Sequence, residues 1–576
     1  MTITRSVLED GELTDSQHWL VRPTRLPLPI QHVIKILPFK TSSNPIYFGN
    51  VKITLPIALV LNCRDKYEYP ENVITMYALS KSKLLAYRQC KKRLWLEVHK
   101  PELRQDSAAT QARFQTGYQV GDIAKRLYDP DGKGAVIDVA TEGFEGAFAR
   151  TAELLAHSQQ PVFEAGFQAN GALAFADVML PEFDSDQLRW RLVEIKSATT
   201  VKDYHRDDLA VQTFVAVSTG VKLRSAAVAH IDNTWVYPGN EDYRGLLKET
   251  DLTAEALARY DEVKAWIAEA QDIVTRPAEP AIAVGDHCFD PFPCGFCNYC
   301  NRGNPQPEYP IGWLPRLSPT KRGRLAEQGV DDLRGVPDHL LSAMQSRVKA
   351  HTLANTVYFD AAGAASDLAP HGFPAYFLDF ETIQFAVPIW KGTRPYQKIT
   401  FQFSLHVLTD PGQLSQTTFL DLSNNDPSES LAKALIAACG DTGPVFVYNA
   451  AFETTCIREL AIRYPDLARP LLVINARIVD LLPIARNRYY HPSQQGSWSI
   501  KAVLPAIAPE LSYAELDGVQ DGGAAMDSFC EAIQSGTSDE RKAVIKSQLF
   551  AYCRLDSLAM VRLWQFFTGR DGFRNG

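Results

Sequence analysis

Four cysteines stand within thirteen residues of this chain, and no other feature of the sequence limits its fold and chemistry as much. They are Cys288, Cys294, Cys297 and Cys300. Thiols clustered in this way are usually metal ligands, and four of them suit either an iron–sulfur cubane or a structural zinc ion. Buried free thiols are the alternative. A fifth cysteine, Cys90, stands alone in a distant segment.

These thiols are expected to stay reduced. The N-terminal residues up to Glu12 contain no apolar stretch behind a basic one, so they do not have the pattern of a secretory signal. The longest apolar run near the N-terminus, residues 53–61, contains Pro56 and is far shorter than the roughly 20 residues that span a bilayer. We therefore expect a cytoplasmic protein without a membrane segment.

The composition is that of an ordinary globular protein. Of 576 residues, 45% are hydrophobic and 22% are charged, which excludes disordered, collagen-like and coiled-coil chains. A chain of this length is expected to form about three domains. The net charge of −8 gives no overall sign of nucleic-acid binding, so such a function would depend on local patches and on metal ions.

The chain is expected to consist of an N-terminal extension of unclear structure and two globular domains joined by a helical linker. The boundaries are 1–75 for the extension, 76–305 for the first domain, 306–370 for the proline-rich linker and 371–576 for the second domain. Beyond residue 370, apolar strand patterns alternate with helical ones, which is typical of α/β domains. The clearest elements are strands over 375–381 and 445–449 and helices over 428–439 and 541–567.

A β-hairpin is predicted over residues 172–196, with a polar turn at 184–186. Its first strand carries Asp177. Its second carries Glu194 and Lys196, which alternation puts on one face. Two carboxylates beside a lysine can hold Mg²⁺ and steady a phosphate during phosphodiester hydrolysis. The alternative is an ordinary exposed Glu/Lys pair, which is the commoner origin of Glu-x-Lys.

A basic segment precedes this hairpin. Residues 81–104 hold eight Lys or Arg against two Glu, in a predicted helix that begins at Ser80 or Ser82. A solvated helix face and a phosphate-binding surface both fit this pattern, and the sequence leaves the two open.

Together the hairpin and the cysteines resemble the RecB-type PD-(D/E)XK nucleases, in particular the CRISPR-associated RecB-like exonucleases and the AddB helicase-nuclease subunit. The resemblance covers roughly residues 76–305 and implies a restriction-endonuclease-like fold. It implies that Asp177 and Glu194 bind the catalytic metal and that Lys196 and Gln212 complete the site.

The same resemblance implies a [4Fe–4S] cluster that joins the two ends of the domain. The implied ligands are Cys90, Cys288, Cys294 and Cys300, with Cys297 as the spare thiol. The sequence departs from the family at residues 117–122, where the usual His of that helix is missing.

Three acidic motifs follow in the second domain. Asp379 and Glu381 end a predicted strand on one face, where two negative charges need a cation. Glu453 opens a helix that follows a strand, and Tyr552 and Asp556 are one helical turn apart. Each motif alone is more often structural than functional, whereas their combination in this order is much rarer.

In order and spacing these motifs resemble the DEDDy branch of the DnaQ-like, RNase H-like 3′–5′ exonucleases, over roughly residues 371–576. The resemblance implies that Asp379, Glu381 and Asp556 bind two Mg²⁺ or Mn²⁺ ions about 3.5–4 Å apart and that Tyr552 orients the attacking water. Glu453 stands where the family has Asp, and its longer side chain can still reach a metal directly or through water.

The segments 477–480 and 497–501 are expected to connect these motifs without taking part in the chemistry. The order of the two domains also resembles a widespread bacterial family whose C-terminal part is a domain of unknown function.

Three hypotheses about function follow. The first is a cytoplasmic, metal-dependent deoxyribonuclease with two active sites, which acts on DNA ends or single strands in repair, processing or defence, together with a helicase or another repair or defence protein. The second is an RNA-directed 3′–5′ exonuclease, because nothing in the sequence reads the 2′-hydroxyl. The third is a nucleic-acid-binding partner protein with one degenerate module, motivated by Glu453 and the missing His.

Overall fold

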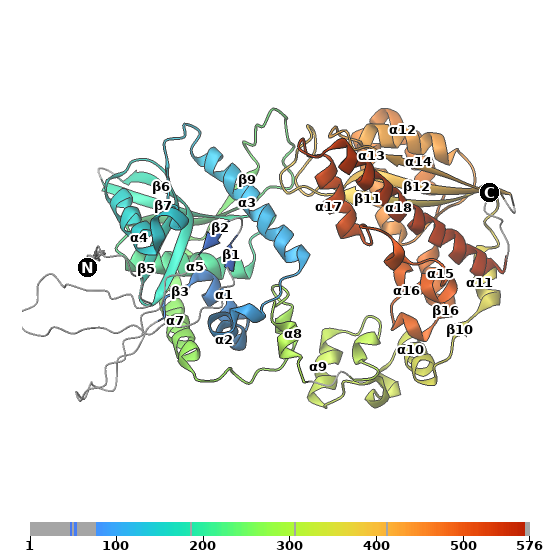
Figure 1. Cartoon of the computed structure of the whole chain (residues 1–576), viewed down its shortest axis with the longest axis horizontal. Coiled ribbons are helices and arrows are strands. Elements are labelled where there is room, and N and C mark those ends of the chain that lie inside the picture. The colour runs from blue at the N-terminus through green and yellow to red at the C-terminus, as the bar shows by residue number, and fades with distance from the viewer. Residues whose placement is uncertain are drawn as a thin grey trace, which may run out of the picture. The chain divides into compact units, whose positions relative to one another are not determined.

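A computed structural model describes most of the chain (Figure 1). The described residues are 46–48, 51–53, 77–184, 187–303, 307–410 and 413–570. The chain divides into two units, residues 1–74 and 75–576, and each is considered by itself. Among the described residues, no helix is long and apolar enough to cross a membrane.

Part of the predicted organisation lies outside the described residues. Of the N-terminal extension, the structure describes one antiparallel strand pair, β1 (Ile46–Phe48) with β2 (Val51–Ile53). Residues 185–186 of the predicted hairpin turn and the domain boundary near residue 305 also lie outside the described residues.

Residues 77–303 form a mixed sheet with helices packed on it. In the described part of this range, seven strands pair in the order β4-β5-β6-β7-β8-β9, with β3 beside β6. The predicted hairpin is confirmed, since β6 and β7 pair antiparallel from Val178 opposite Val193 to Asp184 opposite Gln187. The strands are β3 (Leu79–Ser80), β4 (Ala135–Val136), β5 (Val162–Ala169), β6 (Ala172–Asp184), β7 (Gln187–Lys196), β8 (Leu223–Ile231) and β9 (Leu247–Asp251).

The predicted basic helix is broken into two. Ser80 caps the first, α1 (Lys81–Gln89), by accepting a hydrogen bond from the Lys83 amide. The extended backbone of Cys90 (φ −163°, ψ 123°) then separates α1 from α2 (Lys91–His99). This break places Cys90 at the junction between the two helices.

The remaining helices of this range pack mainly against the sheet and against each other. They are α3 (Ala108–Tyr128), α4 (Val139–His157), α5 (Asp203–Ser218), α6 (Thr253–Ala258), α7 (Tyr260–Thr275) and α8 (Cys297–Cys300). Helix α5 is buried along most of its length because it packs between the sheet and the helices α1, α6 and α7. Leu209, Val211 and Phe214 of α5 belong to the same apolar core as Trp190 and Leu192 of β7.

Residues 307–368 are built from short helices. They are α9 (Pro319–Glu327), α10 (Ala343–Ala354) and α11 (Ala361–Leu368), with 3₁₀ turns between them. A small apolar cluster that includes Leu314, Leu325 and Leu333 holds the first of these segments together.

A second mixed sheet follows. Within the described residues from 375 to 480, its order is β13-β12-β11-β14-β15, with β11, β12 and β13 antiparallel and β14 and β15 parallel to β11. The strands are β11 (Ala375–Ile383), β12 (Ile399–Asp410), β13 (Gln413–Leu420), β14 (Val445–Val447) and β15 (Ile478–Asp480). The predicted strand over 445–449 ends early, because Asn449 adopts φ 84° where the chain turns into the next helix.

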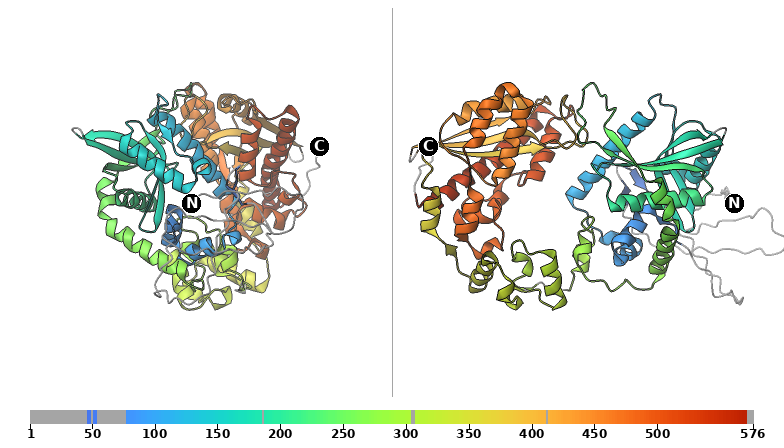
Figure 2. Two further views of the ribbon diagram at one scale, coloured as in Figure 1. Left: turned by 60° about the vertical axis from the view of Figure 1, so that its left-hand side comes forward. Right: turned by 180° about the vertical axis from the view of Figure 1, so that it is seen from behind.

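Helices cover both faces of this sheet (Figure 2). They are α12 (Ser428–Cys439), α13 (Ala450–Arg463), α14 (Pro465–Ala476), α15 (Leu481–Arg488), α16 (Ile500–Ile507), α17 (Gly522–Ala532) and α18 (Asp539–Thr568). The predicted helices over 428–439 and 541–567 are confirmed as α12 and α18. The alternation of sheets and helices confirms the mixed α/β class.

Candidate functional site

The first candidate site lies where β7 faces helix α5. Trp190 and Leu192 point from β7 into the core beneath α5, and by alternation Glu194 and Lys196 continue on that face. Glu194 is 2% exposed. Its carboxylate accepts hydrogen bonds from Lys196 Nζ and from Gln212 Nε2, each at 2.5 Å. The structure thus brings together three residues that the sequence nominated.

Asp177 joins this group from the neighbouring strand β6. Its Oδ2 atom accepts a hydrogen bond of 2.7 Å from the Ile195 amide. Burial raises the pKa of Asp177, and the charges of Lys81 and Lys196 act in the opposite direction. All four sequence-predicted residues of the first site therefore lie in one neighbourhood.

Two further charged residues complete the site and were not found from the sequence. Lys81, the first residue of α1, lies 2.9 Å from Glu194 Oε1 and 3.2 Å from Asp208 Oδ1. Asp208 on α5 is 3% exposed and also pairs with Lys196. The spacing of Asp208 one helical turn before Gln212 is the one sequence signal that could have identified it.

Two histidines lie beside this group. His230 on β8 is paired in register with Lys196 of β7. His205 on α5 is buried, and burial together with the charge of Lys196 lowers its pKa to about 4. Neither histidine was predicted as a site residue from the sequence. The resemblance concerned only the His that is missing from residues 117–122.

The four clustered cysteines and the isolated Cys90 line one cavity. These are Cys90, Cys288, Cys294, Cys297 and Cys300, accompanied by Lys92 and Arg93. Gln89, beside Cys90, donates hydrogen bonds of 2.8 Å to the carbonyls of His287 and Phe292, which ties α1 to the loop before Cys294. Cys297, which the resemblance implies is the spare thiol, lies in the same cavity as the other four cysteines.

The thiols of this cavity hinder one another's ionisation. Burial, followed by Cys288 and Cys294, raises the pKa of Cys297 to about 11. Burial is also the main cause of the raised pKa values of Cys294 and Cys300. Thiols that share a buried cavity in this way remain protonated unless a cation compensates their charge.

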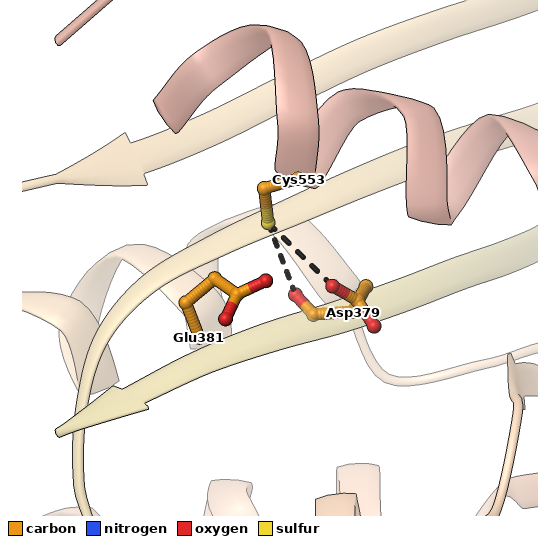
Figure 3. A group of neighbouring side chains, drawn as sticks. All are labelled: Asp379, Glu381 and Cys553. Carbon is orange, nitrogen blue, oxygen red and sulfur yellow. Dashed lines mark hydrogen bonds between the residues drawn. The ribbon is translucent and has the colours of Figure 1, made fainter. Parts of the chain in front are cut away.

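The second candidate site lies between β11 and helix α18. Ala375 and Phe377 of β11 pack in the core that contains α18, so alternation turns Asp379 and Glu381 toward the same helix. Cys553 reaches back from α18, and its Sγ atom lies 3.7 Å from Asp379 Oδ2 (Figure 3). One ligand atom from each of Asp379, Glu381 and Cys553 lies within 4.8 Å of the other two.

The carboxylates of this site strongly disfavour one another's charge. Burial and the neighbouring Asp556 raise the pKa of Glu381 to about 8. Burial, then Asp556, Glu381 and Glu453, raises the pKa of Asp379 well above its usual range. Buried like charges at this spacing are stable as anions only beside a cation.

Asp556 and Tyr552 lie on the face of α18 that looks toward the site. Burial raises the pKa of Asp556 to about 6, while the Tyr513 hydroxyl and Lys501 oppose this rise. Tyr513 donates a hydrogen bond of 2.6 Å to Asp556 Oδ1. The Lys501 ammonium lies 5.0 Å from the ring centroids of both Tyr513 and Tyr552. Lys501 comes from a segment that was expected to be a mere connection, so that expectation missed a cation next to the site.

Glu453 lies in the first turn of α13 and is 3% exposed. Its Oε2 atom has no hydrogen-bond partner, and burial raises its pKa to about 8. Its charge is one of those that raise the pKa of Asp379. Asp480, at the end of β15, accepts hydrogen bonds from the amides of Asn449 and Ala450 and so fixes the start of the helix that carries Glu453.

The basic run of residues 81–104 is internally paired. Seven of its eight Lys and Arg side chains form ion pairs with acidic residues of this chain, and Lys83 donates to the Glu97 carbonyl instead. The acidic partners include Asp207, Glu269 and Glu279, which come from later in the sequence. This pairing argues against an open phosphate-binding surface on α1 and α2.

Comparison with known proteins adds one match. A family described as a domain of unknown function (DUF2779) matches residues 376–499, a range that contains Asp379, Glu381 and Glu453 and ends before Tyr552. No curated protein matches the chain significantly.

Proposed function

We propose that the protein is a metal-dependent nuclease with two hydrolytic sites, which cleaves phosphodiester bonds at DNA ends or in single strands. The observation that carries this proposal is the second site. There Asp379 and Glu381 from one strand lie near Asp556 from a distant helix, and the pKa values of all three are raised. Glu381 and Asp556 are buried, and Asp379 is half-buried. Carboxylates gathered this closely favour the binding of divalent cations, because a cation compensates their mutual repulsion.

The donor set fits such cations. Asp379, Glu381 and Asp556 would be the ligands, and the unpartnered Oε2 atom of Glu453 is available to a further ion or to its water. Bound ions would neutralise these carboxylates and act as Lewis acids on the phosphodiester. Tyr552 would orient the attacking water, and the nearby Lys501 would attract the substrate phosphate.

The first site would work with lysines as well as carboxylates. Asp177 and Glu194 would hold the ion, while Gln212 keeps the buried Glu194 carboxylate in place. The ammonium groups of Lys196 and Lys81 now pair with Glu194 and Asp208. They are the groups that would face a substrate phosphate once an ion takes over the carboxylates.

The architecture of both domains is compatible with the families that the sequence resembles. A carboxylate-bearing β6–β7 hairpin followed by a buried helix with Gln212 supports the PD-(D/E)XK interpretation. A mixed sheet with its acidic strand β11 facing the Tyr- and Asp-bearing helix α18 supports the DnaQ-like, DEDDy interpretation.

We also propose that a [4Fe–4S] cluster occupies the cysteine cavity, with Cys90, Cys288, Cys294 and Cys300 as ligands. Thiolates are the ligands of such clusters, and the gathering of five cysteines from two distant segments around one small cavity supports this proposal. The cluster would join the α1–α2 junction to the segment 288–300 and so close the first domain. Protein with about four irons per chain and a brown colour is expected, whereas stoichiometric zinc in colourless protein would contradict this assignment.

The substrate would be bound with modest, salt-sensitive affinity. Apart from Lys81, which belongs to the first site, the basic residues of α1 and α2 pair mainly with acidic residues outside the two sites. The two active sites and their metal ions would then be the main attraction for phosphates. A helicase or another repair or defence protein would then present the DNA end.

The test is cleavage of matched strands by cluster-loaded protein. Single- and double-stranded DNA labelled at the 5′ or 3′ end, and RNA of the same sequence, are incubated with Mg²⁺ or Mn²⁺. Wild type is compared with Glu194→Gln and Asp379→Asn, which each remove one metal ligand with little change of shape. Glu429→Gln serves as a matched control, because Glu429 is an exposed partner of Lys433 on α12.

Each variant should abolish a separable DNA cleavage activity, and the control should retain both. Preferential degradation of the RNA strand from its 3′ end would replace the DNA assignment by the RNA-directed one. Binding of DNA without cleavage in any of these conditions would contradict the nuclease proposal and support a binding protein.

A further inference from the structure

We propose that the Cys553 thiol is a further metal ligand at the second site and makes this site bind Zn²⁺ and Co²⁺ in preference to Mg²⁺. The inference deepens the proposed function and rests on it only in that the same carboxylates hold the ion. The sequence motifs gave no role to Cys553, which lies between the two functional positions Tyr552 and Asp556.

The geometry around Cys553 is that of a ligand. The residue is fully buried, and its thiol points from α18 toward β11 (Figure 3). It approaches Asp379 Oδ2 at 3.7 Å and the Asp379 carbonyl at 4.0 Å. Ligand atoms of Cys553, Asp379 and Glu381 lie within 4.8 Å of one another. Metal bonds of about 2.0–2.3 Å hold neighbouring ligands about 3–4 Å apart, so small shifts suffice to gather all three around one ion.

A second observation points to the same ion. Glu453 is nine-tenths buried or more, its Oε2 atom lacks a partner, and its charge acts on Asp379. An unpaired buried carboxylate oxygen is costly unless something binds it. Cys553, Asp379 and Glu381 would bind the ion directly, and the free Glu453 oxygen is available to the ion's water.

The surroundings of Cys553 differ from those of a thiol used for packing. Cys439 is an example of the latter, since it is buried in the apolar cluster between β11 and α12 that also contains Leu435 and Val445. Cys553 instead faces two carboxylates, those of Asp379 and Glu381. A thiol that faces two carboxylates is placed to bind a cation together with them.

The donor set determines which cation is preferred. Mg²⁺ takes oxygen ligands in a near-octahedral arrangement, whereas Zn²⁺ and Co²⁺ accept thiolate and carboxylate ligands in a tetrahedral one. As the ion binds, the sulfur–metal bond forms and the thiol proton passes to the solvent. Zn²⁺ would therefore compete with Mg²⁺ for the nuclease site and inhibit it.

The experiment uses Co²⁺ as the probe, in the full-length, cluster-loaded protein. The Co²⁺-induced sulfur-to-cobalt charge-transfer absorption is measured for wild type, Cys553→Ala, Cys553→Ser and Cys439→Ala, and bound Co²⁺ is counted by equilibrium dialysis. Cys439→Ala is the matched control for loss of a buried thiol. Because the cluster cysteines are the same in all four proteins, the differences between them report the second site.

The proposal predicts a charge-transfer band in wild type and Cys439→Ala that is missing from both Cys553 variants. Cys553→Ser keeps a polar atom of similar size, so it remains informative if the alanine variant fails to fold. A band of equal strength in the Cys553 variants, or Co²⁺ bound to wild type without this difference, would overturn the proposal.

A second readout links the thiol to activity. The Zn²⁺ concentration that halves Mg²⁺-dependent cleavage should rise about tenfold or more in Cys553→Ser, because even partners of metal ligands contribute about 10–100-fold to affinity. Unchanged inhibition by Zn²⁺ would contradict the proposed selectivity. The charge-transfer band in a protein that cleaves no nucleic acid would leave the metal site standing and refute the nuclease function alone.

Discussion

The charge of Glu381 should destabilise the metal-free protein at high pH. Burial and Asp556 raise the Glu381 pKa from 4.5 to about 8 in the folded protein. A carboxyl whose folded pKa lies above its unfolded value contributes stability below the unfolded pKa, and this contribution is lost as the pH rises through the folded pKa. The shift corresponds to about 5 kcal/mol as an upper figure, at 1.36 kcal/mol per pKa unit. The loss should therefore develop between about pH 4.5 and 8.

The perturbation is Glu381→Gln, which removes the charge and keeps the shape. In metal-free protein the variant should gain stability relative to wild type between pH 5 and pH 8, by a few kcal/mol. For a domain of about 200 residues this corresponds to a relative shift of the melting temperature of roughly 6–12 °C. Mn²⁺ at about 100 times its dissociation constant should add about 2.7 kcal/mol to wild type at pH 8 and much less to Glu381→Gln.

The assay is thermal unfolding followed by tryptophan fluorescence, at pH 5 and pH 8, with and without Mn²⁺. The difference between wild type and Glu381→Gln reports the charge of this carboxyl together with its effect on Asp379, and cancels the titration of distant groups. Glu429→Gln, at an exposed position on α12, should follow wild type under every condition. The reasoning would be refuted if Glu381→Gln and wild type shifted equally with pH, or if Mn²⁺ stabilised both to the same extent.

Three further predictions concern other parts of the molecule. Lys81→Met should destabilise the metal-free protein by about 3 kcal/mol, because it leaves buried Glu194 and Asp208 with one cation fewer. In urea unfolding, Mg²⁺ should raise the free energy of unfolding of Lys81→Met more than that of wild type. An equal gain in both proteins would contradict this account of the site. Cys90→Ser should lose most of the iron and the visible absorption while Cys439→Ala retains them, as measured by metal analysis; iron kept in Cys90→Ser would exclude Cys90 as a ligand. Burial lowers the pKa of His406 to about 4, so its stabilising effect is present above pH 6.5 and is lost as the pH falls toward 4. Between pH 7 and pH 4, the free energy of unfolding of His406→Gln should therefore fall by about 3 kcal/mol less than that of wild type. Urea midpoints that change equally with pH in both proteins would refute that expectation.

The sequence predicted those features that have a local signal. The β6–β7 hairpin follows from period-2 alternation on both sides of a polar turn, and α12 and α18 follow from helical periodicity. The same alternation identified Glu194 with Lys196 and Asp379 with Glu381 as same-face pairs. Local patterns of this kind do not depend on the rest of the fold, which is why they could be read directly.

Features that depend on contacts between distant segments could not be predicted. Lys81 meets Asp208 only because α1 packs against α5, and neither residue belongs to a recognisable motif. The basic run looked unpaired because its partners, such as Glu269, lie on later helices. No glycine or proline marks the helix break at Cys90, so the sequence predicted one continuous helix there.

Tertiary packing places at the second site several residues that belong to no sequence motif. Cys553 stands next to Tyr552 in the sequence, but its contact with Asp379 follows from the way α18 crosses β11. Lys501 reaches the site because α16 packs on α18. Tyr513 follows in the next turn of the chain and donates a hydrogen bond to Asp556. A sequence gives the order of such residues, whereas their neighbours are set by the tertiary fold.

The most direct test of the central claim is the rate of nucleotide release from end-labelled DNA by the double variant Glu194→Gln/Asp379→Asn. It is measured beside wild type and both single variants in parallel preparations with Mn²⁺. Removing a metal ligand at both sites should lower the total rate by about 100-fold or more, while each single variant keeps the activity of the intact site. A double variant that releases nucleotides at the wild-type rate would show that neither site is responsible for cleavage.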